Sequence, residues 1–163
     1  MKKLFLHINI LIVSFLLIGC TNFNKSQYIP PKEKPTLTYY TNEIKNKLDN
    51  NESFNIKVFD MNVYKYYEVS KDEHTILLEF IDSLSSNNFS SDIDKTLIPS
   101  FKVIIEFSDS KYVINAYSNS LVTIYPWDGI YKEDIISMEN VSDYYNIYKF
   151  CEYIKKVSLG FEG

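Results

Sequence analysis

The chain has 163 residues, of which 17 are lysines and 21 are acidic, and its formal net charge at pH 7 is −4. It contains no arginine, so it offers no guanidinium fork to a phosphate or carboxylate group. An acidic chain of this kind lacks the electrostatic footprint of a nucleic-acid-binding protein, and its length suits one domain rather than two. We therefore expect a single acidic domain with no nucleic-acid partner.

Residues 1–20 have the pattern of an export signal. Two lysines precede an apolar stretch from Leu4 to Ile18, which is shorter than the about 20 residues of a membrane-spanning helix. The stretch ends in Leu17, Ile18, Gly19 and Cys20, and this ending resembles the lipobox of bacterial lipoproteins. The resemblance implies that the Cys20 sulfur receives a diacylglyceryl group and that cleavage leaves Cys20 as the first mature residue. An ordinary signal peptide and an uncleaved anchor are the alternatives.

The lipobox divides the chain into three parts. We assign residues 1–19 to the signal peptide, 20–38 to the lipidated cysteine and a flexible, proline-containing tether, and 39–163 to one folded domain. Two acyl chains hold a protein on a membrane far more firmly than one, so we expect the mature protein on the outer face of the cell membrane. Abundant Lys, Asn, Ile and Tyr without Arg is typical of an AT-rich genome and indicates a Gram-positive source. With Cys20 lipidated, Cys151 stands alone and no internal disulfide forms.

The first half of the domain combines helix and strand patterns. Residues 41–49 place Ile44 and Leu48 on one helical face, and residues 54–58 alternate apolar and polar side chains like a half-buried strand. Residues 63–69 continue as a strand or a sheet edge. Residues 70–73, SKDE, have the form of a capping box. The helix that follows the box has an apolar stripe made of Ile76, Leu77, Phe80, Ile81 and Leu84, and residues 85–94 after it are a polar loop.

The second half predicts a sheet and a last helix. Residues 101–107, 112–117 and 121–125 have strand patterns, and strands this close in sequence indicate an antiparallel meander. Residues 126–129, PWDG, predict a turn. Residues 142–157 predict a helix whose apolar face is formed by Tyr144, Ile147, Tyr148, Cys151 and Ile154. We therefore predict an α+β fold, in which helices pack on one face of an antiparallel sheet of three or more strands.

The centre of the domain carries a segment with a recognisable likeness. Residues 108–135, SDSKYVINAYSNSLVTIYPWDGIYKEDI, follow the lipobox and the short tether in a tyrosine-rich chain. This layout resembles a group of clostridial lipoproteins, and the likeness covers most of the chain. It implies a lipid-anchored protein of the cell envelope, and no catalytic or binding residues come with it.

The residues that catalysis or metal binding requires are sparse. His74 is the only histidine of the mature chain and falls in the first turn of a helix, where we expect a solvent-facing side chain. Cys151 lies on an apolar stripe, which favours a buried, inert thiol. Asp92 and Asp94 have the spacing that begins a calcium loop, but the glycine and the distal glutamate of such a loop are missing. With four glycines and no phosphate-binding loop, we expect no cofactor and no metal.

The aromatic residues indicate binding instead. The chain has 14 tyrosines, 11 phenylalanines and one tryptophan, which is more than a small core needs. Tyr125, Trp127, Asp128 and Tyr131 gather around the predicted turn and are the candidate binding residues for a sugar, a peptide or a partner protein. A tryptophan beside a turn often closes the end of a core, so the sequence leaves the exposure of Trp127 open. The tyrosines at positions 64, 66 and 67, and at 144, 145 and 148, are expected in the core or at its boundary.

We therefore predict a non-enzymatic lipoprotein that binds an envelope protein or glycan. Two alternatives remain open. A hydrolase acting on cell-wall material would pair Asp128 with Glu133 or Asp134, with the two carboxylates facing each other and a raised pKa on one of them. A structural or assembly lipoprotein would present a larger apolar patch or an edge strand to its partner.

Overall fold

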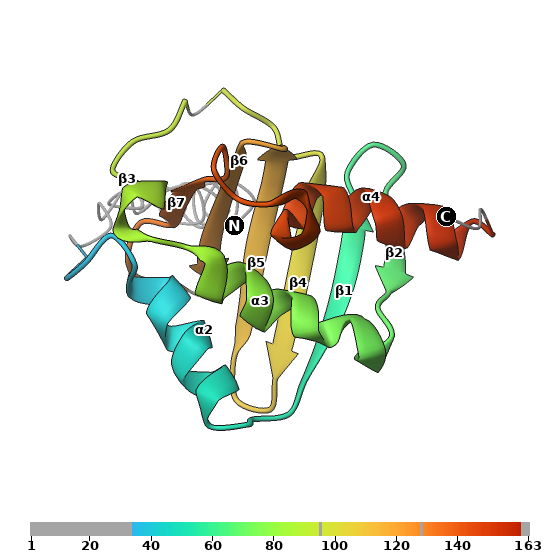
Figure 1. Cartoon of the computed structure of the whole chain (residues 1–163), viewed down its shortest axis with the longest axis horizontal. Coiled ribbons are helices and arrows are strands. Elements are labelled where there is room, and N and C mark those ends of the chain that lie inside the picture. Colours follow the sequence, from blue (N-terminus) through green and yellow to red (C-terminus); the bar gives the residue numbers. More distant parts are fainter. Residues whose placement is uncertain (1–33, 95, 128, 161–163) are drawn as a thin grey trace, which may run out of the picture. The chain divides into compact units, whose positions relative to one another are not determined.

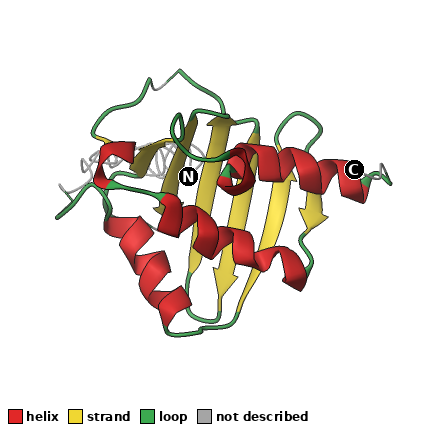
Figure 2. Cartoon of the chain, viewed as in Figure 1, coloured by secondary structure: helices red, strands yellow, loops and turns green. Residues whose placement is uncertain are grey.

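A computed structural model of the protein describes residues 34–94, 96–127 and 129–160. Within these residues the chain forms one antiparallel sheet of seven strands, with three α-helices packed on one face of the sheet (Figures 1 and 2). The predicted α+β fold is therefore confirmed. The lipobox, Cys20, most of the tether and Asp128 lie outside the described residues.

The sheet is built around a meander in the second half of the chain. Its strands are β1 (Phe54–Asp60), β2 (Lys65–Glu68), β3 (Phe89–Ser90), β4 (Phe101–Phe107), β5 (Lys111–Ser118), β6 (Leu121–Pro126) and β7 (Asp134–Ser137). The spatial order is β2-β1-β4-β5-β6-β7-β3, and every neighbouring pair is antiparallel. The chain makes the β1–β2 hairpin at one edge, crosses the helix-covered face, adds β3 at the opposite edge and returns to the centre as β4 (Figure 1).

Strand alternation decides which side chains face the helices. Ile56 of β1 lies opposite Ile105 of β4, and Ile114 of β5 lies between Val103 and Ile124. Each of these five side chains is at most 1% exposed, and all belong to the core under the helices. The residues that alternate with them point to the other face of the sheet, which none of the described helices covers (Figure 2). We call this second surface the open face.

Each helix contributes one apolar stripe to the core, as the amphipathic patterns predict. Helix α2 (Tyr39–Asp49) buries Tyr40, Thr41 and Ile44; α3 (Thr75–Ser83) buries Ile76, Leu77, Phe80 and Ile81; and α4 (Ile147–Ser158) buries Ile147, Phe150, Cys151 and Ile154. Burial of one such large apolar side chain contributes about 1.5–3 kcal/mol. No helix in the described part of the chain is long and apolar enough to cross a membrane.

The capping box predicted at Ser70 is wrong. Residues 71–74 form a 3-10 turn, and the Ser70 side chain makes no capping hydrogen bond. The Glu73 carboxylate instead accepts a hydrogen bond from the hydroxyl of Tyr153, at 2.9 Å. A capping box does occur later, where the Asn88 side-chain oxygen accepts from the backbone N–H of Ser85 at 2.9 Å. Glu73 therefore bonds a side chain of the distant helix α4, and not the backbone at the start of its own helix.

The last helix begins later than predicted. Asn146 is its N-cap, and the Asn146 side-chain oxygen accepts hydrogen bonds from the backbone N–H groups of Tyr148 and Lys149 at 3.1 and 3.3 Å. Asparagine at this position satisfies N–H groups that have no partner within the helix. Tyr144 precedes the cap, in a 3-10 turn, and therefore does not lie on the apolar face of the helix.

Several tyrosines that we expected in the core or at its boundary are exposed. The exposed fraction is 77% for Tyr64, 57% for Tyr66 and 87% for Tyr144, whereas Tyr67 is buried as expected. Tyr64 lies in the β1–β2 turn with a positive φ of 53°, and Tyr66 points to the open face, where its ring lies 4.5 Å from that of Phe59. Tyr64 and Tyr66 are exposed because they lie at the edge of the sheet, and Tyr144 because it lies in the 3-10 turn before α4.

Candidate functional site

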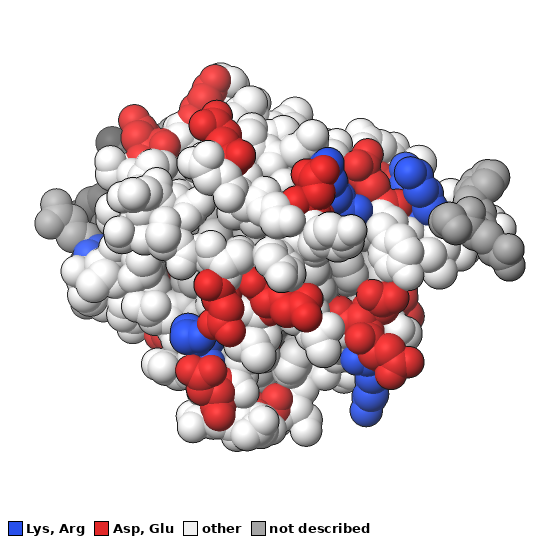
Figure 3. All heavy atoms as spheres, viewed as in Figure 1, with Lys and Arg blue, Asp and Glu red and all other residues white. Residues whose placement is uncertain are grey.

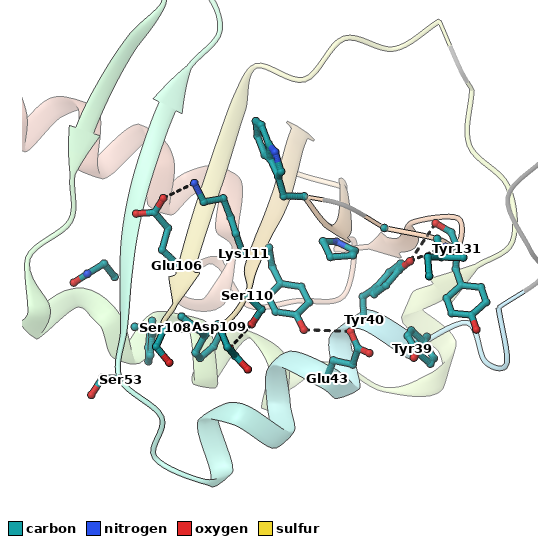
Figure 4. Close-up of a pocket in the computed structure, with 18 of the residues that line it drawn as sticks. Tyr39, Tyr40, Glu43, Ser53, Glu106, Ser108, Asp109, Ser110, Lys111 and Tyr131 are labelled. Carbon is teal, nitrogen blue, oxygen red and sulfur yellow. Dashed lines mark hydrogen bonds and ion pairs between the residues drawn. The ribbon is translucent and has the colours of Figure 1, made fainter. Parts of the chain in front are cut away.

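A groove of 1040 Å³ opens at one end of the sheet, where α2 meets the turn between β4 and β5 (Figure 4). Its walls include the first turns of α2, residues 53–55 at the start of β1, and residues 106–112 around that turn. The last wall is the end of β6 with the segment after it, which together comprise Pro126, Trp127 and residues 129–131. We call this last segment the 126–131 loop. The volume lies at the upper end of the about 300–1,000 Å³ of small-molecule sites, and aromatic rings and charged groups mix along the walls.

Tyr40 ties the 126–131 loop to α2. Its hydroxyl accepts a hydrogen bond from the backbone N–H of Tyr131 at 2.9 Å and donates one to the Tyr131 carbonyl at 3.2 Å. The predicted turn is closed by a hydrogen bond from the Gly129 N–H to the Pro126 carbonyl, at 3.3 Å. A Cβ atom at position 129 would lie 3.1 Å from the Tyr40 hydroxyl and 3.0 Å from Pro126 Cγ, so a glycine permits this close packing. The loop is thus held to α2 through Tyr131 and packs closely on Tyr40 at Gly129.

Two tyrosines flank a carboxylate on the α2 side of the groove. The Tyr112 hydroxyl donates a hydrogen bond to Glu43 Oε2 at 3.2 Å. Burial raises the pKa of Tyr112 to about 12, and the charge of Glu43 adds to the rise. A hydrogen bond with Glu43 raises the pKa of Tyr39 as well. Both phenols therefore remain protonated at neutral pH, with the proton of each directed to Glu43, and their oxygens can accept hydrogen bonds from a ligand.

The opposite wall carries paired charges. Lys111 Nζ lies 2.6 Å from Glu106 Oε1, and this contact holds the pKa of Glu106 below its usual value (Figure 4). The same Lys111 nitrogen lies 5.5 Å from the centre of the Trp127 ring, and the Trp127 backbone N–H donates to the Lys111 carbonyl at 2.9 Å. The Trp127 side chain is 70% exposed. A large ring held by its backbone and by a cation is thus presented to solvent.

Comparison with known proteins gives a family and one similar structure. A family model described as "Domain of unknown function (DUF4883)" matches residues 34–151, which is most of the chain. The chain belongs to this family. It is similar to the crystal structure of a "Putative Lipoprotein from Clostridium perfringens", with 28% sequence identity and a TM-score of 0.70 over 76% of this chain and 98% of that one. None of the curated proteins matches the chain.

In this DUF4883 domain, three of the four candidate binding residues lie in the 126–131 loop or directly before it. Trp127 and Tyr131 line the groove, and the Tyr131 ring packs edge-on against Tyr39 with ring centres 5.0 Å apart. Tyr125 points to the open face and lines a second, smaller hollow of 380 Å³ on the other side of the same loop. Asp128, the fourth candidate, lies outside the described residues. Trp127 is a surface residue and does not close the core.

Asp134, one of the carboxylates considered for hydrolysis, has a structural role in the DUF4883 domain. It is fully buried under α2, where Oδ2 accepts hydrogen bonds from the backbone N–H and the hydroxyl of Thr41, both at 2.8 Å. Its other oxygen pairs with Lys34 Nζ at 2.7 Å. Glu133, the next residue back, lines the hollow on the open face, so the two carboxylates lie on opposite sides of the sheet. Lys34, which we assigned to the tether, is anchored to the folded unit by this contact.

The resolved pKa shifts of carboxyl groups do not identify a general acid. Hydrogen bonds from Lys47 and Ser110 lower the pKa of Asp109, and those from Thr96 lower the pKa of Asp94. A catalytic acid needs the opposite shift, which burial or a neighbouring carboxylate produces. These groups are ionised acceptors at neutral pH.

The remaining chemical candidates do not line the groove themselves, although His74 packs on Phe54, which does. The His74 ring is half-buried rather than solvent-facing, and it stacks on Phe54 with ring centres 5.1 Å apart. Cys151 is fully buried, as predicted, and burial raises the pKa of its thiol. Asp92 and Asp94 lie in an exposed loop. Among the described residues, no group of three or more His, Cys, Asp or Glu side chains is placed to hold a metal ion.

Sequence reasoning missed most of the groove. Tyr39 and Tyr40 precede the helix predicted at residues 41–49, and Tyr112 was expected only as a strand residue. Glu43 falls within that predicted helix, and nothing in the sequence singled it out. The one available signal was the density of tyrosine itself, because two adjacent tyrosines at a helix start are hard to bury completely.

Proposed function

We propose that this protein is a lipid-anchored binding module on the outer face of the cell membrane, tethered through Cys20. The lipobox supports the anchor, and so does the similarity to a protein described as a lipoprotein. Lys34 begins the described part of the domain, and residues 21–33 can extend at most about 45 Å at about 3.5 Å per residue. The tether therefore keeps the domain near the lipid surface while leaving it free to meet other envelope components.

Fatty-acid labelling tests the anchor. Cys20→Ala should yield an unlipidated and uncleaved precursor, because only a thiol at this position forms the thioether. The wild-type chain should incorporate labelled fatty acid, and Cys151→Ala, which removes the other cysteine, should incorporate as much label as the wild type. Label on Cys20→Ala, or normal processing of that variant, would refute the proposed anchor.

We propose further that the domain binds an envelope protein or glycan through the groove. The observation that carries this proposal is the 70% exposed Trp127 ring, which stands on a loop fixed by Tyr40 at the rim of a groove. Exposed aromatic rings in fixed positions are typical of contact surfaces, because they bury much area at little cost in conformational entropy. The phenol oxygens of Tyr39 and Tyr112 and the carboxylate of Glu43 would supply directional hydrogen bonds.

A titration of the soluble chain tests the groove. Every described core residue lies between Tyr40 and Ile154, so a chain that begins at Thr21 retains them all. Addition of fractionated wall fragments or envelope extract should shift the Trp127 emission saturably. Tyr39→Ala should weaken the binding. The control is Tyr144→Ala, which also removes a tyrosine ring, and because Tyr144 is 87% exposed and lies outside the groove, this variant should bind as the wild type does. Equal affinities for both variants would place the binding elsewhere.

A second candidate function is assembly with a protein partner. Strand β2 forms one edge of the sheet, and Tyr64 and Tyr66 are exposed there. An edge strand with exposed aromatic side chains can accept a further strand from another protein. Crosslinking from position 66 to a single envelope protein, without any saturable response of Trp127, would favour assembly over the groove. None of the described residues favours the hydrolase alternative.

A further inference from the structure

The hollow behind the 126–131 loop differs in chemistry from the groove. Four residues of the open face line it, and they are Asn115 and Tyr117 of β5, Tyr125 of β6 and Glu133. Its rim is formed by Pro126, Trp127, Gly129 and Tyr131, all of which also line the groove. Trp127 therefore stands between two concave surfaces. The 380 Å³ of the hollow lie at the lower end of the range for ligand sites.

The polar groups of the hollow are mostly neutral. Burial raises the pKa of both Tyr117 and Tyr125, so their hydroxyls remain protonated at neutral pH. Glu133 supplies the one carboxylate among the described lining residues, and none of these residues is basic. Lys111 lies beside the Trp127 ring at the rim but is paired with Glu106 Oε1 at 2.6 Å, so the charge that an anionic ligand meets inside the hollow is that of Glu133. A ligand with several hydroxyl groups would meet donors and acceptors on the floor and flat rings at the rim.

An unpaired buried oxygen marks the floor of the hollow. Asn115 is 8% exposed, and its amide nitrogen donates a long hydrogen bond of 3.4 Å to the Thr123 hydroxyl. Its Oδ1 atom is buried and has no hydrogen-bond partner within the described part of the chain. Such an acceptor destabilises the fold unless a water or ligand donor satisfies it. The Asn115 side chain is within hydrogen-bonding reach of the hydroxyls of Tyr117 and Tyr125, which line the same hollow.

We infer that this hollow binds a neutral pyranose residue of a glycan. The inference rests on the proposed binding function and specifies its ligand class and subsite. The sugar ring places its C–H face against Trp127 and its hydroxyl edge against Asn115, Tyr125 and Glu133. A carboxylate and an amide that flank a flat aromatic face provide what a polyhydroxylated ring requires, which is paired acceptors and donors beside an apolar surface.

Binding of defined oligosaccharides tests the inference on the chain that begins at Thr21. Chitotetraose and cellotetraose are neutral probes, and tetragalacturonate is an anionic probe of similar length. At least one neutral probe should bind with a saturable heat of binding and a shift of Trp127 emission, and tetragalacturonate should bind at least tenfold more weakly. Glu133→Gln should weaken the binding about tenfold, because hydrogen bonds to a charged group are the stronger ones. Tyr125→Phe, which keeps the ring, should weaken it about fivefold.

The groove variant Tyr39→Ala separates the two proposals. It should leave the affinity for a bound tetrasaccharide within twofold, because Tyr39 does not line the hollow. If neither neutral probe binds while envelope material still binds through Tyr39, the sugar subsite is refuted and the groove proposal stands. Equal affinity for tetragalacturonate, or unchanged affinity in both Glu133→Gln and Tyr125→Phe, would also overturn the subsite. Loss of envelope binding in these two variants, but not in Tyr39→Ala, would support the hollow and contradict the groove.

Discussion

The hydroxyl of Tyr40 should contribute measurably to stability, although it is a single atom on a ring that stays in place. The ring is 2% exposed, and its hydroxyl serves both the N–H and the carbonyl of Tyr131. Tyr40→Phe removes both hydrogen bonds and leaves two backbone groups without this partner. At about 1 kcal/mol for each bond, with part of the desolvation cost added, the free energy of unfolding should fall by about 2–3 kcal/mol.

Urea denaturation followed by far-ultraviolet circular dichroism measures this change. With about 1–3 kcal/mol per molar urea for small proteins, the midpoint should move down by about 0.7–3 M. The anisotropy of Trp127 should fall as well, because the loop that carries it loses its attachment to α2. Tyr153→Phe is the matched control, since its hydroxyl bonds Glu73 at an exposed site and its loss should change stability by about 0.5 kcal/mol or less. Equal midpoints and equal anisotropy for Tyr40→Phe and the wild type would refute the role given to Tyr40.

Three further predictions concern buried polar groups. Lys34→Ala leaves the buried Asp134 without its ion-pair partner and should lower the free energy of unfolding by about 3 kcal/mol. Urea denaturation measures this change, and a loss below about 1 kcal/mol would contradict the anchoring of Lys34. Burial tends to raise the pKa of Asp60, but the hydrogen bond from Lys155 helps to lower it overall. Because the folded pKa lies below the unfolded value of about 3.9, the contribution of Asp60 is complete above pH about 5 and is lost as the pH falls further. Asp60→Asn should therefore be less stable than the wild type at pH 7 and should lose less stability between pH 5 and pH 3; parallel curves would contradict this. Cys151 should resist alkylation in the native chain that begins at Thr21 and react only on unfolding in urea, so rapid native labelling would contradict its burial.

The regular parts of the fold follow from the sequence, because period alone determines them. Val103 and Ile105 face the helices and alternate with Lys102, Ile104 and Glu106, which face the other way. The predicted meander appears as β4, β5 and β6. Strand β7 begins at Asp134, a residue type that strands disfavour, and it is stabilised there by Lys34, a hundred residues away in sequence. The capping box predicted at Ser70 does not form, and Glu73 bonds Tyr153 of α4. This contact, like that of Lys34, is distant in sequence.

The candidate site was predictable only in part. Trp127 and Tyr131 were chosen because a turn gathers aromatic residues, and both line the groove. The contact of Tyr40 with Tyr131 joins residues 91 positions apart, so no local pattern could indicate it. Nor does spacing along the chain reveal that Asn115 and Glu133 line one hollow, because strand register and the open side of the sheet bring them together. Long-range pairing, rather than local propensity, creates the site.

The central claim is that the anchored domain binds an envelope component beside Trp127, and one resonance can test it. Trp127 is the single tryptophan of the chain, so 5-fluorotryptophan gives one fluorine signal in the lipidated protein on vesicles. Wall fragments that sediment with these vesicles should shift this signal saturably, and Tyr39→Ala should weaken the response while Tyr144→Ala preserves it. Fragments that sediment with the vesicles but leave the fluorine signal unchanged would contradict a binding site at the 126–131 loop.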